Sequence, residues 1–258
     1  MNIGSIIGIV IMVAGLIGMI VCSKKQRVNP ALQPVSIALF IGVLVGGFLF
    51  LRGQGIIGNA KGKDAIAREV AYQEARGRVI GEFIKDAKDV DAGKKILFIT
   101  DPGYVKAEKK DKIAEALIKS LEKACGRTVE VAAVAVPENA EEDGGDNEYM
   151  TAKAVNELLA KHTDAGIVIF NNNLPENPQQ ISVFKTKNGP KVILIGRGGA
   201  DGKFITAKMK SGELLGLVMG KPGVKSGEPA ASDYKKAFDY RYVLISKDNL
   251  ESKAELLK

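Results

Sequence analysis

The sequence contains no tryptophan, one histidine and two cysteines among its 258 residues. His162 alone cannot build a site that needs two histidines, and Cys22 and Cys125 are too few for a disulfide framework. The chain also lacks a Gly-x-Ser-x-Gly nucleophile turn and a glycine-rich loop followed by a Walker lysine. These absences favour a non-enzymatic protein, and no catalytic residue, metal ligand or cofactor is predicted.

Acidic residues are absent from residues 1–60, which hold four basic residues. Residues 61–258 carry the other 33 basic residues against 30 acidic ones, within a formal net charge of +7 for the chain. The larger part of the chain is thus nearly balanced and has no excess of positive charge for a phosphate backbone. Nucleic acid is not an expected partner.

Charged residues are missing from two long apolar runs, Ile3 to Val21 and Val35 to Leu51. About 20 apolar residues in a helix cross the ~30 Å hydrocarbon core of a bilayer. Core helices of soluble proteins keep a polar face, and these runs have none. The sequence predicts an integral protein of the inner or plasma membrane, with a hairpin at 1–60 that spans the lipid bilayer at about 3–21 and 35–51.

The loop between the two runs, residues 23–27, contains three basic residues. Short basic loops remain in the cytoplasm, so both ends of the hairpin are expected outside. Arg52, Lys61 and Lys63 follow the second run and act against this orientation. The denser loop favours an extracytoplasmic, periplasmic location for the rest of the chain.

Small residues recur four positions apart in both runs: Gly4 and Gly8, Ala14 and Gly18, Gly42 and Gly46. Such spacing lets helix backbones approach closely in lipid. The pairs could serve the hairpin alone or further membrane helices. They outnumber what one contact needs, which favours a homo-oligomer or other membrane-protein subunits as partners.

Residues 61–92 form a predicted amphipathic connecting helix, with an apolar stripe that begins at Ile66 and Val70. Gly77 and Gly81 share one face, where a neighbour could come close. Two alternatives stay open: a helix packed on its own domain, or a stalk in an oligomer.

Residues 93–258 alternate between short apolar runs and amphipathic segments. Continuous apolar runs are typical of strands covered on both faces. Repeated strand–helix units predict an α/β fold with a doubly wound, mostly parallel, Rossmann-like sheet. The expected strands are 96–100, 129–136, 166–170, 192–195, 214–219 and 242–245, and the expected helices are 113–124, 150–159, 178–184 and 204–210.

Three segments carry a family resemblance. Lys95–Tyr104 reads Lys-Ile-Leu-Phe-Ile-Thr-Asp-Pro-Gly-Tyr, Asp164–Asn171 reads Asp-Ala-Gly-Ile-Val-Ile-Phe-Asn, and Asn188–Ile195 reads Asn-Gly-Pro-Lys-Val-Ile-Leu-Ile. Residues 95–200 thereby resemble the N-terminal lobe of type 1 periplasmic binding proteins, the sugar-binding and LacI-like superfamily. The resemblance implies a single lobe that offers a small solute a crevice, since the chain after Gly220 is too short for a second lobe.

Polar residues follow the expected strands, where open parallel sheets bind ligands. Asp101 could accept hydrogen bonds and Tyr104 could stack on a ligand. The asparagines could donate and accept, and Arg197 could bind an anion, although Gly196 stands where sugar binders of this superfamily often carry an Asp. The alternative is that such loops are polar in any case. The candidate ligand-binding residues are Asp101, Tyr104, Asn171, Asn172, Asn173, Arg197 and Lys221.

Two further segments invite a ligand interpretation. The loop 196–202 is rich in glycine, but Asp201 stands where the dinucleotide fingerprint needs its third glycine, so a simple turn is favoured. The acidic stretch 138–148 does not have the oxygen spacing of an EF-hand, so no calcium site is predicted.

Three functions are consistent with these observations. The leading hypothesis is a membrane-anchored, extracytoplasmic, non-enzymatic structural or interaction component of a larger membrane assembly. The alternative is a single-lobe binding or sensory module for a small, sugar-like polar solute. The third is a hydrolase or transferase that uses Asp101 as a nucleophile.

Overall fold

A computed structural model describes residues 3–26, 33–53, 60–88, 90–91, 93–108, 110–135, 150–225 and 227–257. The chain divides into two compact units, Met1–Ala67 and Arg68–Lys258. The acidic stretch 138–148, considered above for calcium, lies outside the described residues.

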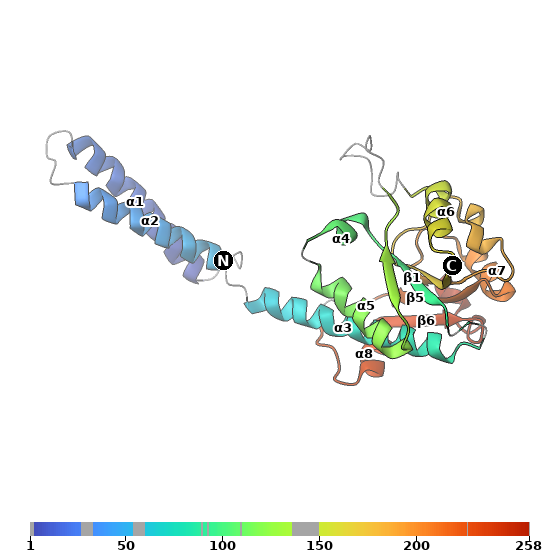
Figure 1. The fold of residues 1–258 in the computed structure, drawn as a ribbon. Helices are drawn as coiled ribbons and strands as arrows, with labels where there is room; N and C mark the ends of the chain where they lie inside the picture. The colour runs from blue at the N-terminus through green and yellow to red at the C-terminus, as the bar shows by residue number, and fades with distance from the viewer. Residues whose placement is uncertain are drawn as a thin grey trace. The chain divides into compact units, whose positions relative to one another are not determined.

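The first unit contains a helical hairpin of α1 (Ile3–Gln26) and α2 (Gln33–Gly53) (Figure 1). The backbones of the two helices come close together at Gly8 and Gly46. A Cβ atom on Gly8 would lie 2.7 Å from the carbonyl oxygen of Gly46, and a Cβ atom on Gly46 would lie 2.9 Å from that of Gly8. Gly42 differs, because no atom lies within 4 Å of its Cβ position. The hairpin therefore uses part of the small-residue pattern and leaves Gly42 open.

The two helices of the hairpin differ in the length of their apolar segments. Pro34–Leu51 in α2 has 18 residues, a mean hydropathy of 2.4 and 6% of its residues buried, so it is long and apolar enough to cross a bilayer. The apolar segment of α1 with described side chains, Ile6–Cys22, is shorter. One described helix is thus long and apolar enough to cross a bilayer, and the second span stays a prediction.

The second unit is built on a six-stranded sheet with the order β2-β1-β3-β4-β5-β6. Its first five strands are parallel and β6 runs antiparallel to β5. This confirms the predicted α/β fold with a mostly parallel sheet. The strands are β1 (Lys95–Ile99), β2 (Val129–Ala132), β3 (Ala165–Phe170), β4 (Lys191–Ile195), β5 (Leu214–Gly220) and β6 (Tyr242–Ser246).

The antiparallel direction of β6 follows from where the preceding helix ends. Helix α8 (Tyr234–Arg241) stops beside the end of β5, where the Lys221 amide donates to the carbonyl oxygen of Arg241 (2.9 Å). The chain therefore enters β6 at the carboxyl end of β5 and can only run back along it. Sequence periodicity identified this strand but not its direction.

Side chains alternate between the two faces of the sheet and form two apolar cores. Ile96 and Phe98 face α3 (Ala60–Asp86), α5 (Lys112–Cys125) and α8, whereas Leu97 and Ile99 face the opposite side. That opposite side is covered by α6 (Ala152–Lys161) and α7 (Gly202–Ser211) (Figure 1). The short 3-10 segments η2 (Pro178–Gln180), η3 (Ser182–Phe184) and η4 (Ala254–Leu257) add to this cover.

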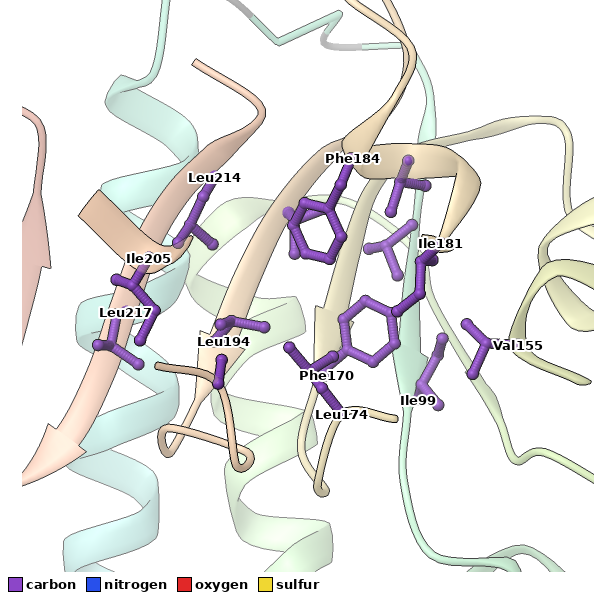
Figure 2. Close-up of a cluster of buried hydrophobic side chains, with 14 of the residues drawn as sticks. Ile99, Val155, Phe170, Leu174, Ile181, Phe184, Leu194, Ile205, Leu214 and Leu217 are labelled. Carbon is purple, nitrogen blue, oxygen red and sulfur yellow. The ribbon is translucent and has the colours of Figure 1, made fainter. Parts of the chain in front are cut away.

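The second of these cores draws on most of the sheet. Figure 2 shows Ile99, Phe170, Leu194 and Leu217 from four strands gathered with Phe184 of η3. All five side chains are almost completely buried. Burial of each side chain contributes roughly 1.5–3 kcal/mol to the stability of the fold. This core therefore fixes the strands from which the loops at the edge of the sheet begin.

Helix α3 belongs to the second unit from Arg68 onward and packs on its sheet. Tyr72, Ile80 and Ile84 are fully buried against the sheet. Gly77 allows the close crossing with α5, because a Cβ atom there would collide with the carbonyl oxygen of Leu117. The sequence left two alternatives open for this helix: packing on its own domain, or a stalk in an oligomer. In the structure, residues 68–86 pack on their own domain.

Two helices were not expected from the sequence. Helix α4 (Pro102–Lys106) begins directly after Asp101, whose side chain accepts a hydrogen bond from the Gly103 amide. Helix α8 begins after Asp233, which caps it in the same way through Lys236. Both have an Asp at the N-cap, but each is too short for an apolar stripe to stand out.

Candidate functional site

The strand order reverses between β1 and β3, because β2 lies beside β1 on one side and β3 continues the sheet on the other. In open parallel sheets this switch point, at the carboxyl ends of the strands, is where ligands bind. The loops that begin at Thr100, Asn171 and Gly196 all leave the sheet at this edge.

A hollow of about 730 Å³ lies beyond the ends of β3 and β4. We call it the carboxyl-edge hollow. Its volume falls in the range of roughly 300–1,000 Å³ typical of small-molecule sites. Its walls come from the start of α6 (150–153), the loop after β3 (173–177, with Gln180) and the glycine loop after β4 (198–199).

The three asparagines after β3 have different positions. The Asn171 amide donates to the carbonyl oxygen of Ile99 (2.9 Å) and extends the pairing with β1. The Asn172 side-chain nitrogen contacts Met150 Sδ (3.7 Å), and its Oδ1 is buried with no hydrogen-bond partner among the described residues. Asn173 lines the carboxyl-edge hollow. A buried acceptor without a partner is costly, which marks this corner as unusual in the fold.

The glycine loop forms the opposite wall and requires glycine for conformational reasons. Gly196, Gly198 and Gly199 have φ values of 86°, 58° and 77°, in the left-handed region. The Leu174 amide donates to the Gly198 carbonyl oxygen (2.7 Å), which ties this loop to the one after β3. The loop is therefore a glycine-rich turn that closes one side of the hollow, as the sequence favoured.

Arg197 and Lys221 do not line this hollow. The Arg197 guanidinium donates to the carbonyl oxygen of Leu257 (2.9 Å) and ties the loop to η4. The Lys221 ammonium donates to the carbonyl oxygen of Asp239, at the end of α8. Both cations follow strands as predicted, but both bind backbone carbonyl groups of neighbouring segments.

Asp101 and Tyr104 are also separate from the hollow. Asp101 Oδ1 accepts from the Gly103 amide (2.6 Å) as the cap of α4. The ring of Tyr104 packs on the core beneath α3, α5 and α8, and Lys110 Nζ lies 5.2 Å from its centre. Burial raises the pKa of Tyr104, with a further contribution from Glu115. Of the predicted residues, Asn173 alone lines the hollow, and Asn172 lies next to it.

Several residues of the hollow were not identified from the sequence. Thr151 caps α6, its Oγ1 accepting from the Ala154 amide (3.1 Å), and Glu176 and Asn177 lie in the loop after β3. The repeated asparagines and prolines at 171–178 were the available signal, since such residues mark an ordered turn. Across the described ranges, no group of three His, Cys, Asp or Glu side chains is arranged to hold a metal ion.

No protein-family profile matches this chain, and no curated protein matches it. Among solved structures, a carbohydrate transporter solute-binding protein from Agrobacterium radiobacter, in complex with D-arabinose, has a TM-score of 0.44 and 19% identity, over 72% of this chain and 63% of that one. A carbohydrate transporter from Acidothermus cellulolyticus, in complex with myo-inositol, has a TM-score of 0.42 and 13% identity, over 73% and 60%. A glucose-galactose binding protein from Geobacillus stearothermophilus has a TM-score of 0.40 and 13% identity, over 70% and 61%.

These proteins are of the class that the sequence resembles. The chain spans about 60% of the length of each of them. At such identities and TM-scores, its function has to be argued from its own residues.

Proposed function

We propose that this chain is a membrane-anchored, single-lobe module that binds or senses a small polar solute in the carboxyl-edge hollow, without enzymatic activity. The observation that carries the proposal is the hollow itself, at the ligand-binding edge of a doubly wound sheet. Its walls are held by core packing and by the bond between Leu174 and Gly198. A site of this kind is formed before the ligand arrives.

The polar groups around the hollow suit an uncharged, hydroxyl-rich solute. Asn173, Asn177 and Gln180 carry amides that both donate and accept, as polyol hydroxyl groups do. Lys153 and Glu176 contribute one charge of each sign, so the walls carry no net charge. D-arabinose and myo-inositol, which two of the similar structures contain, are therefore suitable first probes.

The third hypothesis, catalysis by Asp101, receives little support from its surroundings. The carboxylate caps α4 through the Gly103 amide and is absent from the walls of the hollow. Around the hollow, the Thr151 hydroxyl accepts a hydrogen bond from the Ala154 amide in its role as the cap of α6. A covalent mechanism needs a nucleophile next to a base.

The anchor belongs to the same proposal. The hairpin crosses the membrane twice, with the basic loop at 23–27 in the cytoplasm and the soluble unit outside. The apolar segment Pro34–Leu51 and the run from Ile3 to Val21 support this arrangement. A periplasmic solute would then meet the hollow directly.

Calorimetric titration of the full-length chain in lipid nanodiscs tests the proposal, with D-arabinose, myo-inositol and a panel of related polyols. We expect at least one to bind and Asn173→Ala to weaken it at least about tenfold, because an amide–hydroxyl contact with the solute is lost. Asn188→Ala, at an exposed turn elsewhere in the same unit, is the matched control. Equal binding by both variants would refute this site.

A second function, a component of a larger membrane assembly, is favoured by one observation. The Cβ position of Gly42 is open, whereas Gly8 and Gly46 are filled by the hairpin contact. An open small residue on a membrane helix permits a further helix to approach. Native mass spectrometry in mild detergent should then show an oligomer that Gly42→Leu dissociates, while Gly47→Leu leaves it intact; a monomer throughout would contradict this function.

A further inference from the structure

A second hollow, of about 450 Å³, lies beside β6 at the edge of the sheet. We call it the edge-strand hollow. It shares no lining residue with the carboxyl-edge hollow. Residues of α3, α8, β6 and the C-terminal segment surround it, and the function proposed above makes no use of them.

The floor of the edge-strand hollow is apolar and built from rings. Phe238 and Tyr242 are almost fully buried, with ring centres 5.7 Å apart. Phe83 of α3 lies over β5 at Gly216, where a Cβ atom would come within 2.9 Å of the ring. Glycine at this position therefore makes room for the ring that shapes the hollow.

Three lysines from different segments line the same space: Lys221 after β5, Lys235 in α8 and Lys253 in the C-terminal segment. Lys221 is held in place by the carbonyl oxygen of Asp239. Lys253 is half-buried, and its ammonium group has no hydrogen-bond or ion-pair partner among the described residues. A half-buried cation without a partner favours an anion beside it.

Two acidic residues, Glu82 and Asp239, line the same hollow and offset part of this charge. Both oxygens of Glu82 accept from the Tyr234 hydroxyl (2.8 Å each), and Oε1 also accepts from Arg78 Nε (3.3 Å). Asp239 is exposed, as are Lys221 and Lys235. Three lysines against Glu82 and Asp239 leave the lining with a net charge of +1 above an apolar floor.

The edge of β6 is partly closed to an added strand. Asn249 accepts from the Ser246 amide (2.9 Å) and donates to the Leu244 carbonyl oxygen (3.0 Å), which occupies two of the outer hydrogen-bonding groups of the strand. The remaining space suits a small molecule better than a peptide strand.

We propose that the edge-strand hollow binds a small ligand with a ring-sized apolar body and one anionic group, of the aryl phosphate class. The body lies on Phe83, Phe238 and Tyr242, and the anion contacts Lys253 and Lys235. This site is independent of the carboxyl-edge hollow, so either proposal can fail alone.

Fluorine NMR of the full-length chain in nanodiscs tests the site with 4-fluorophenyl phosphate as the probe. We expect its signal to broaden on binding, with much less broadening for the neutral 4-fluorobenzyl alcohol. Lys253→Gln and Lys235→Gln should each weaken binding at least about fivefold, because each removes a charge-assisted contact. Lys253→Arg should retain it.

Lys247→Gln is the matched control, because Lys247 is exposed just after β6 and does not line the hollow. The site is wrong if the phosphate probe shows no broadening, or if the neutral alcohol broadens as much. It is equally wrong if Lys253→Gln binds the probe as well as Lys247→Gln does.

Discussion

Next to the carboxyl-edge hollow, one buried polar atom has no hydrogen-bond partner among the described residues. Asn172 Oδ1 is buried without a partner in the described part of the chain, although its nitrogen contacts Met150 Sδ. Cores normally exclude such an atom because its desolvation is not compensated. The side chain next to it, Asn173, faces the hollow. An uncompensated polar atom lowers the stability of the free protein. Such a cost is typical of loops that bind a ligand rather than of loops that only connect two elements.

Replacing Asn172 by leucine tests this cost directly. We expect Asn172→Leu to leave the free energy of unfolding unchanged or raise it by about 1 kcal/mol, because an unpartnered acceptor is removed and the shape is kept. Asn172→Asp, which buries a charge in the same place, should lower it by about 2 kcal/mol or more. Denaturant titration measures both. A large loss of stability in the leucine variant would show that the amide has a partner.

The glycine loop gives a paired test of backbone conformation and steric contact. Gly198 and Gly199 both have positive φ, but only at Gly198 would a Cβ atom meet a neighbour, the Leu174 amide nitrogen at 3.0 Å. Gly199→Ala should cost about 1 kcal/mol of stability for its φ alone. Gly198→Ala should cost about 1 kcal/mol more and should also weaken solute binding, since it pushes the two walls apart. Equal effects would contradict the contact.

Of the predicted ligand-binding residues, Asn173 lines the carboxyl-edge hollow and the others do not, and the difference depends on how each loop turns after its strand. The rule that ligands bind at the carboxyl ends of parallel strands placed Asp101, Asn173 and Arg197 at the correct edge of the sheet. It does not say on which face each loop turns. Tyr104 turns towards the helices α3 and α5, Asn173 faces the start of α6, and Arg197 reaches η4.

For the helices and strands, the sequence predicted the positions of the strands better than the direction in which they pair or the short helices between them. Apolar runs such as Ile96–Ile99 identify strands covered on both faces, because consecutive residues of such a strand are all buried and therefore all apolar. The reversal of β6 depends on the contact between Lys221 and Arg241, twenty positions apart in the sequence. The sequence did not predict helices α4 and α8, because each is too short to contain enough apolar positions for a periodic pattern.

The crossing of α3 and α5 is the element-level feature most sensitive to a single change. Gly77→Ala places a methyl group against the carbonyl oxygen of Leu117, so the helices must separate. We expect a loss of about 2 kcal/mol or more, even though alanine favours an isolated helix over glycine. Thermal unfolding of the full-length chain provides the measurement. Glu74→Ala, at an exposed position of the same helix, should change stability by less than about 0.5 kcal/mol.

At the scale of the whole molecule, the proposal joins a membrane hairpin to a single binding lobe. The apolar segments supply the anchor, and one described segment, Pro34–Leu51, meets the length and hydropathy of a span. The other predicted span depends on the uncharged run from Ile3 to Val21, and the predicted orientation depends on the basic loop at 23–27.

Membrane insertion and sidedness are measured together with single cysteines in a chain whose Cys22 and Cys125 are replaced by serine. A cysteine at Lys25 should be labelled by a membrane-impermeant maleimide only after the cells are opened, whereas one at Lys153 should be labelled in intact spheroplasts. The chain should also stay in the membrane fraction after washing with alkaline carbonate. Release by the wash would rule out the anchor, and the opposite labelling pattern would reverse the orientation.

Hydrogen–deuterium exchange of the full-length chain, with and without its best-binding polyol, locates the bound solute on the chain. We expect slower exchange in residues 150–154, 173–177 and 196–200 and no change at 221–235. Protection confined to other segments, or no protection at saturating polyol, would contradict solute binding in the carboxyl-edge hollow.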